Sequence, residues 1–336
     1  MFTMHDPLLT DEDLKQCWSK HMTCMVHGKI GAGQTAGEER EKAWHGITST
    51  FKFPSPSPPV VTCIKGTSGL SPNQDNFSVS FLTNGWTLIC CSDGHGLYGQ
   101  LVATRVVQSV PYFMAQQFAV GVEEDGIPDA LAAAFQHAQE DLEAHSAKFG
   151  WDCEASGTTL VAALHNGYKV YTANCGDSRC IIGLEQSGEL VFATQDHKPD
   201  LLSEQARIDA AGGEVRSEVF SDGWIVHRVF KRGQEFPGLC KSRTLGDTLA
   251  KECGVSAVPE ISVTEVKSSQ KPFMIVASDG VWEFLDSEFI VKAVSKVLPV
   301  DGPTRALHKL QREAKKRWKQ EVGSPSDDIT AVLVRL

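Results

Sequence analysis

Two aspartates, Asp93 and Asp279, each follow an apolar run and directly precede a glycine. The runs are Trp86–Cys91 and Phe273–Ala277, and one serine stands between each run and its aspartate. A buried strand that ends at a carboxylate beside a glycine places that carboxylate at the edge of a sheet. A single Asp-Gly pair is a common turn, but the shared context favours a site assembled from several strand ends.

Two further acidic positions have the same relation to an expected strand. Asp75 opens an alternating apolar run that reaches Phe81, and Asp327-Asp328 precedes the apolar run Ile329–Val334. Clustered carboxylates repel one another and lose hydration energy when buried, so their convergence requires cations. Oxygen ligands of this kind suit Mg²⁺ or Mn²⁺ better than Zn²⁺.

Three further side chains each have two interpretations. His95 follows Asp93 by two residues, where it could protonate a leaving oxygen or serve as a structural histidine. Glu283 lies four residues after Asp279 and could reach the same site or cap a following helix. Glu154 could be an outer metal ligand or a solvated loop acid.

The charge and the glycine-containing loops limit which phosphate-bearing ligands are expected. The 32 basic and 42 acidic residues give a net charge of -10, which argues against nucleic acid held by phosphate neutralisation. Gly157-Thr158-Thr159 and Gly176-Asp177-Ser178 lack the lysine of a Walker motif, which argues against nucleotide binding. A phosphorylated substrate must therefore be attracted by local positive charge, most simply by bound metal.

Location and cysteine chemistry follow from the absence of two signals. No run of about 18 apolar residues is present, which argues against a membrane span. The N-terminal residues Met1–Asp6 lack the basic and apolar regions of a secretory signal. We therefore expect a cytoplasmic or nuclear protein whose ten cysteines are reduced thiols.

One cysteine–histidine cluster has a metal-binding alternative. Cys17, His21, Cys24 and His27 offer zinc ligands, although their spacing matches no common zinc finger. The other interpretation is an amphipathic helix from Asp11 to about Met25 that carries two thiols, and we favour it.

The chain divides into an extension and a folded domain. Residues 1–59 form the expected N-terminal extension and proline-rich linker, and residues 60–336 form the domain. Asn166-Gly167 between two apolar runs predicts a hairpin, and short connections from 158 to 193 imply antiparallel strands. Grouped strands with helices inserted in pairs indicate an α+β fold whose helices cover the sheet faces. Helical periodicity marks residues 99–118, 128–149, 288–297 and 304–319.

The order of the motifs resembles that of the metal-dependent serine/threonine protein phosphatases of the PP2C type, the PPM family. The resemblance covers about residues 60–336 and implies a four-layer α-β-β-α sandwich of two antiparallel sheets flanked by helix pairs, with a binuclear metal centre at one end. The segments that carry it are, in order, Asn73–Asp75, Asp93–Gly96, Ser156–Thr159, Ala173–Arg179, Asp196–Pro199, Glu204–Gly213, Ser242–Asp247, Ser278–Glu283 and Ser326–Thr330.

The resemblance also implies the chemistry. Two Mg²⁺ or Mn²⁺ ions would activate a bridging water to hydroxide, which attacks the phosphorus of phosphoserine or phosphothreonine. His95 would act as the general acid toward the leaving alkoxide. Glu283 and Glu154 fall where relatives can bind a weaker third ion, and the carbonyl of Gly94 helps to hold one metal. The implied metal-site residues are Asp75, Asp93, Gly94, Asp279, Asp328, Glu283 and Glu154.

The chain departs from the family pattern beside Asp75. Leu70 stands where many relatives carry an arginine that binds the substrate phosphate, and Gln74 stands where glutamate is frequent. Loss of the arginine predicts weaker phosphate binding. A compensating cation could come from Lys65 or from the basic stretch His227–Arg232, which could equally select substrates.

Three functions compete at this stage. The first is a phosphatase that acts on phosphoprotein partners as a monomer, and the second is a catalytically impaired relative that serves as a binding scaffold. The third is a hydrolase of small phosphate esters. Because inactive relatives typically lose metal-binding aspartates, the four retained here favour activity; they are Asp75, Asp93, Asp279 and Asp328.

Overall fold

Long apolar strands that are buried on both faces determine the architecture of this protein. The computed structural model describes residues 8–30, 42–45, 58–67, 72–220, 223–323 and 326–336, and for residues 23–30 and 42–45 the backbone alone is described. Every residue of Asp75–Leu82 is buried, so this strand has no face toward solvent. Strands of this kind require a covering layer on each side.

Two antiparallel sheets supply the inner layers. Within the described residues, the first has nine strands in the order β15-β8-β7-β5-β4-β1-β2, with β6 paired to β5 and to β14. Its strands are β1 Met22–Ile30, β2 Lys42–His45, β4 Asp75–Leu82, β5 Thr87–His95, β6 Gly157–Thr158, β7 Leu160–His165, β8 Lys169–Cys175, β14 Leu245–Gly246 and β15 Glu260–Glu265.

The second sheet has five strands in the order β10-β9-β16-β17-β3. The predicted hairpin at Asn166-Gly167 is confirmed, since it joins β7 to β8 in antiparallel register. The strands of the second sheet are β3 Val60–Ile64, β9 Arg179–Leu184, β10 Leu190–Ala193, β16 Pro272–Ala277 and β17 Ile329–Arg335.

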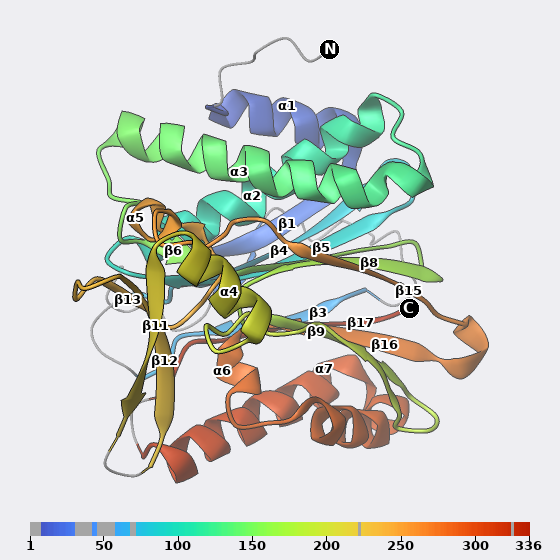
Figure 1. Cartoon of the computed structure of the whole chain (residues 1–336). Helices are drawn as coiled ribbons and strands as arrows, with labels where there is room; N and C mark the ends of the chain where they lie inside the picture. The colour runs from blue at the N-terminus through green and yellow to red at the C-terminus, as the bar shows by residue number, and fades with distance from the viewer. Residues whose placement is uncertain (1–7, 31–41, 46–57, 68–71, 221–222, 324–325) are drawn as a thin grey trace.

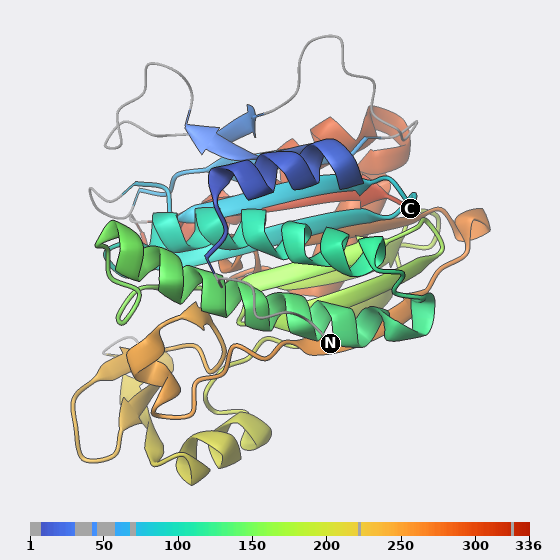
Figure 2. The same cartoon turned by 90° about the horizontal axis from the view of Figure 1, so that it is seen from above.

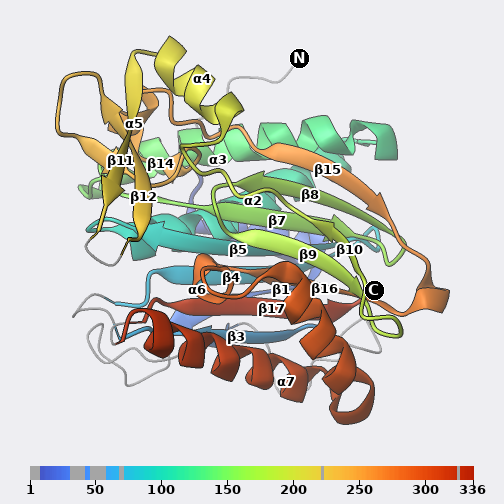
Figure 3. The ribbon, with the colours of Figure 1, turned by 60° about the horizontal axis from the view of Figure 1, so that its bottom comes forward.

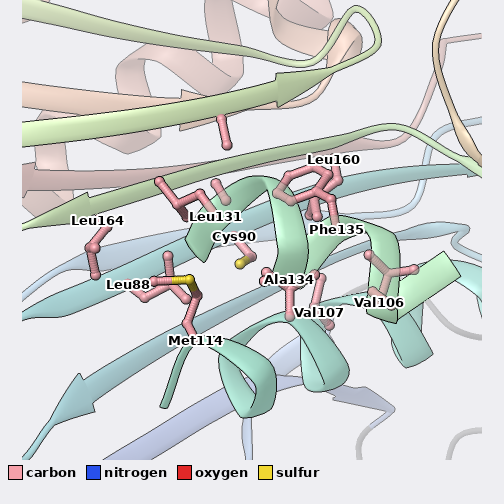
Figure 4. Packing of buried hydrophobic residues seen from close by; sticks show 14 of the residues in the cluster. Leu88, Cys90, Val106, Val107, Met114, Leu131, Ala134, Phe135, Leu160 and Leu164 are labelled. Carbon is pink, nitrogen blue, oxygen red and sulfur yellow. The ribbon is translucent and has the colours of Figure 1, made fainter. Parts of the chain in front are cut away.

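Side-chain alternation along each strand separates the cores. In β5, Ile89 and Cys91 belong to the core between the two sheets, whereas Leu88 and Cys90 belong to the core beneath the helices. Figure 4 shows that second core, where Leu88 and Cys90 meet residues of two helices such as Met114. The period of two thus lets one apolar run serve two layers at once.

Helices form the outer layers, and the predicted sandwich of two antiparallel sheets between helices is confirmed (Figure 1). The first sheet is covered by α1 Asp11–His21, α2 Gly99–Ala119 and α3 Ile127–Phe149, which lie across it together (Figure 2). The second sheet is covered by α7 Ser287–Glu321, which bends at Gly302 into two arms. The two arms correspond to the predicted helical segments 288–297 and 304–319. Short helical pieces are η1 Glu124–Gly126, η2 Ser268–Gln270 and α6 Asp279–Trp282.

The helix expected from Asp11 to about Met25 is shorter than predicted. It ends at His21, and β1 begins at Met22 and pairs antiparallel with β4. The backbone amides of β4 offer a full ladder of partners, and this pairing outweighs the helical periodicity. The division between residues 1–59 and 60–336 stays a prediction, although α1 and β1 lie before it and pack on the sandwich.

A small module extends from one end of the sandwich (Figures 1 and 3). It contains a three-stranded antiparallel sheet, β11-β12-β13, with a helix on each side of it in sequence. Its elements are α4 Leu202–Ala210, β11 Gly213–Val219, β12 Ile225–Lys231, β13 Pro237–Leu239 and α5 Thr248–Lys251. Across the whole described chain, no helix combines the length and the hydropathy needed to traverse a membrane.

Candidate metal centre

Strand ends from both sheets bring carboxylates to one place. Asp75 begins β4 and is the register partner of Asp93 near the end of β5. Asp279 follows β16, Asp327 precedes β17, and these two strands are antiparallel neighbours. Antiparallel pairing places the end of one strand beside the start of the next, so the predicted convergence of distant aspartates follows from the topology.

One close group of carboxylates includes a residue to which the sequence alone assigned no role. Carboxylate oxygens of Asp93, Asp177 and Asp279 all lie within 4.8 Å of one another. Asp177 occupies the turn between β8 and β9. Its segment was recognised as a possible phosphate loop and as part of the family motif Ala173–Arg179, but Asp177 itself was given no role. The signal was present, because Asp177 follows an apolar strand as Asp93 does, but its glycine precedes it instead of following it.

Burial and neighbouring carboxylates disfavour the charged forms of Asp75, Asp93 and Asp327, whereas Lys241 and Lys198 outweigh burial at Asp177 and lower its pKa to about 2. Burial, together with the carboxylates of Asp93 and Asp328, raises the pKa of Asp75 well above its usual value. Burial also raises the pKa of Asp93 well above normal, although Lys241 opposes the shift. Burial and the nearby Asp279 raise the pKa of Asp327 to about 7. Buried carboxylates with raised pKa values become stable as anions when a cation binds, and their hard oxygen atoms suit Mg²⁺ or Mn²⁺.

Two lysines partly neutralise the group. Lys241 Nζ lies 3.5 Å from Asp93 Oδ2 and 3.6 Å from Asp279 Oδ2. Lys198 Nζ donates to Asp177 Oδ2 at 2.6 Å. Burial disfavours the charged form of Lys241, but the carboxylates of Asp177 and Asp93 outweigh it and hold the pKa of Lys241 well above normal.

The two neighbouring aspartates before β17 face different partners. Asp328 Oδ1 accepts from the Gly66 amide and Asp328 Oδ2 from the Gln74 amide, each at 2.7 Å. The side chain of Asp328 thereby ties the segment before β4 to the start of β17. Asp327 instead contributes to the electrostatic environment of Asp93, as does Asp279.

Asp75 and Gly94 are held in place by the same strand ends. Ser278 Oγ donates to Asp75 Oδ2 at 2.6 Å and accepts from the Thr330 amide at 3.0 Å. A Cβ atom on Gly94 would overlap the carbonyl groups of Gly99 and Gln74. Position 94 therefore requires glycine because the chain passes too close for any side chain.

The two predicted outer glutamates differ in their surroundings. Burial raises the pKa of Glu283, with Lys198 opposing and Asp279 adding to the shift, so Glu283 lies within the field of the centre. Glu154 is exposed, and within the described ranges no hydrogen bond or ion pair joins its carboxylate to Asp93, Asp177 or Asp279. Its assignment as an outer ligand stays a prediction.

His95 is paired with an aspartate from the module side of the fold. Its Nε2 lies 2.7 Å from Asp247 Oδ2, and its side chain is 22% exposed. Asp247 precedes α5 and approaches β6 so closely that a Cβ on Gly157 would overlap its carboxylate. The other ring nitrogen, Nδ1, has no hydrogen-bond partner among the residues that the structure describes. The sequence analysis assigned no role to Asp247.

The family model for Protein phosphatase 2C matches residues 75–322 of this chain. The chain belongs to the protein phosphatase 2C family. This range contains every strand end described above except that of β17.

Curated relatives in plants agree with this assignment. The probable protein phosphatase 2C 52 of Arabidopsis thaliana is 32% identical over 327 residues, which cover 85% of this chain and 66% of that protein. The probable protein phosphatase 2C 61 of the same plant is 33% identical, with coverage of 82% of this chain and 83% of that protein. The chain thus spans slightly less than two thirds of the first relative.

Solved structures share the fold. A serine-threonine phosphatase 2C from Toxoplasma gondii aligns with a TM-score of 0.66 at 20% identity, covering 84% of this chain and 98% of that chain. A C. elegans sex determining protein aligns with the same TM-score and identity, covering 65% of its own chain. At this identity the likeness supports the fold and nothing finer.

The basic stretch proposed to replace the missing family arginine is occupied by other contacts. Arg228 pairs with Glu218, Lys231 with Glu252, and Arg232 with Asp209. Leu70 lies outside the described residues. Among the described residues, Lys241 and Lys198 contact the carboxylates of Asp93, Asp177 and Asp279, and neither lysine was given a role from the sequence.

The zinc alternative receives no support from the described side chains. Cys17 is buried in the core beneath α2, where burial raises the pKa of its thiol to about 11. The side chains of Cys24 and His27 lie outside the described residues. The nine cysteines whose side chains are described form no disulfide with one another, and the reduced state stays a prediction.

Proposed function

We propose that this protein removes phosphate from phosphoserine and phosphothreonine in protein substrates, with Mg²⁺ or Mn²⁺ held by the strand-end carboxylates. The observation that carries the proposal is the grouping of Asp93, Asp177 and Asp279 within 4.8 Å at the junction of two sheets. Carboxylates packed this closely, two of them buried, are a donor set that suits hard divalent cations, and the chain belongs to a phosphatase family.

The ligand set that we propose differs from the sequence-based one at two positions. We assign Asp327 in place of Asp328, because both carboxylate oxygens of Asp328 already accept backbone amides. We add Asp177 as a ligand of a further, weaker ion together with Asp279 and, nearby, Glu283. Asp75 and Asp93 keep their assigned roles.

Each part of the centre has a chemical task. When bound, two divalent ions supply charge neutralisation for the phosphoryl oxygens and activate a water at neutral pH. Asp93 and Asp75, from adjacent strands, would help to hold those ions. His95 carries the proton for the leaving alkoxide, and Asp247, whose carboxylate lies 2.7 Å from Nε2, orients the ring.

The function is tested by phosphate release from a phosphothreonine peptide with and without Mn²⁺. We expect turnover that requires Mn²⁺ and falls at least about 10²-fold in Asp93→Asn. Turnover of small esters but of no phosphopeptide would support the small-ester hydrolase instead. Mn²⁺ binding with no turnover of either substrate would support the scaffold.

The choice between the neighbouring aspartates has its own matched pair of variants. Asp327→Asn should weaken Mn²⁺ binding measured by calorimetry, whereas Asp328→Asn should mainly lower the melting temperature through lost amide contacts. Equal Mn²⁺ affinity in wild type and Asp327→Asn would return the assignment to Asp328.

Location and assembly remain proposals as well. We propose a cytoplasmic or nuclear monomer, and the nine free cysteines among the described residues support the location. A tagged full-length chain found in the secretory pathway, or a dimeric mass in sedimentation, would contradict it.

A further inference from the structure

A buried lysine occupies the middle of the acidic group. Lys241 lies between β13 and β14, and its side chain is only 9% exposed. Its Nζ lies 3.5 Å from Asp93 Oδ2, 3.6 Å from Asp177 Oδ1 and 3.6 Å from Asp279 Oδ2. These are the three aspartates whose carboxylate oxygens lie within 4.8 Å of one another.

The distances describe a shared charge rather than a bonded pair. Hydrogen bonds between ammonium and carboxylate groups are about 2.7–2.9 Å long, and Lys198 makes one with Asp177 Oδ2 at 2.6 Å. Lys241 is farther from all three carboxylates and nearly equidistant from them. An ammonium in this position acts as a cation surrounded by oxygen donors.

Asp177 shows why the position matters. Its side chain is fully buried, and its Oδ1 has no hydrogen-bond donor within the part of the chain that the structure describes. The group that faces this oxygen is the Lys241 ammonium. A buried carboxylate oxygen without a donor is costly, and a nearby positive charge offsets part of that cost.

We propose that Lys241 is a built-in cation that holds Asp93, Asp177 and Asp279 together in the metal-free protein and competes with a divalent ion for the position among them. An ion that enters this position must displace the ammonium or tolerate its charge at close range. The centre therefore binds fewer ions, or binds its weakest ion less tightly, than the same carboxylates would without the lysine. This inference rests on the proposed metal-dependent function.

The first test needs no metal and measures the melting temperature after treatment with EDTA. Lys241→Met keeps the length of the side chain and removes its charge, so uncompensated carboxylates should lower the melting temperature by about 5 °C or more. Adding Asp177→Asn to this variant should restore part of the loss. Lys292→Met is the matched control, since its ammonium is exposed and pairs with Glu288 on α7.

The second test counts Mn²⁺ ions by calorimetry and by the electron paramagnetic resonance of free Mn²⁺. Lys241→Met should bind one ion more than wild type, or its weakest ion at least about tenfold more tightly, and Lys292→Met should match wild type. An unchanged metal-free melting temperature in Lys241→Met would overturn the inference, as would equal Mn²⁺ isotherms in two proteins that both bind Mn²⁺. If neither protein binds Mn²⁺, the proposed metal-dependent function fails, and so does the proposed competition between Lys241 and a divalent ion. The role of Lys241 as a counter-ion survives in that case if Lys241→Met melts at a lower temperature than wild type.

Discussion

His95 and Asp93 lie two residues apart near the end of β5, so strand alternation turns both side chains toward the same face of the sheet. Two residues of one short motif can thereby serve the metal and the leaving group. Asp247 joins them from more than 150 residues away in sequence, through a carboxylate 2.7 Å from His95 Nε2. Its closeness depends on Gly157, which leaves room for the carboxylate.

The role of His95 as an acid can be separated from a structural role by the choice of leaving group. His95→Gln should lower kcat on a phosphothreonine peptide by about 10²–10⁴-fold. On p-nitrophenyl phosphate the loss should be much smaller, because p-nitrophenolate leaves without being protonated. An equal loss on both substrates, in steady-state assays at one pH, would show that His95 does not supply this proton.

Sequence reasoning located the aspartates that end apolar strands, because burial followed by a turn leaves a local pattern. It gave no role to Asp177 and Asp247, although both lie in family motifs, or to Lys241, which directly precedes the motif Ser242–Asp247. Their roles arise from contacts between segments distant in the chain, and no single-sequence pattern encodes such contacts. The choice between Asp327 and Asp328 also depends on which carboxylate meets the amides of Gly66 and Gln74.

At the scale of elements, a buried ion pair fastens the helical layer. Arg105 of α2 donates through Nε and Nη2 to both carboxylate oxygens of Asp141 on α3, each at 2.7 Å. The same two side chains contact the backbone of Leu9, just before α1. Three helices are therefore held through one polar cluster inside an otherwise apolar layer.

Removal of one partner of this pair should be costly. Asp141→Ala leaves Arg105 buried without its carboxylate and should lower the free energy of unfolding by about 3–5 kcal/mol. Urea denaturation of full-length protein measures this loss, and Glu288→Ala serves as the control, since its exposed pair with Lys292 should contribute little. A change no larger in Asp141→Ala than in the control would mean that the apolar contacts alone hold α2 and α3.

The ends of helices were predictable from sequence periodicity where no distant strand pairs with the same residues. The expected helices at 99–118 and 128–149 agree with α2 and α3 to within a residue. The helix through Met25 was wrong, because the open edge of β4 pairs with Met22 and the residues after it. The pairing residues of β4 lie more than 50 positions away in sequence, so a local pattern cannot reveal them.

At the scale of the whole molecule, residues before the predicted domain boundary take part in the sandwich. β1 covers the edge of β4, and Cys17 and Met22 are buried in the core shared with α2. The four-layer arrangement could be inferred from the order of motifs, but this contribution could not, because residues 1–59 carry no motif of the family.

A chain that begins at residue 60 should therefore be less stable than one that begins at Leu8. It exposes the edge of β4 and part of the apolar surface of α2, so it should melt at a lower temperature and associate through the free edge. Calorimetry and light scattering of the two chains measure both effects. Identical melting temperatures and monomeric scattering would show that the domain starts at residue 60, as the sequence suggested.

We infer that distant carboxylates meet at the ends of two sheets to bind a pair of divalent ions. The most direct measurement is an anomalous difference map from crystals grown with Mn²⁺, recorded near the manganese edge. We expect two manganese peaks beside Asp93, each about 2.1 Å from the nearest carboxylate oxygens, with Asp279 and Asp327 among the ligands. A map with no peak between Asp93 and Asp279 in a protein that still releases phosphate would contradict it.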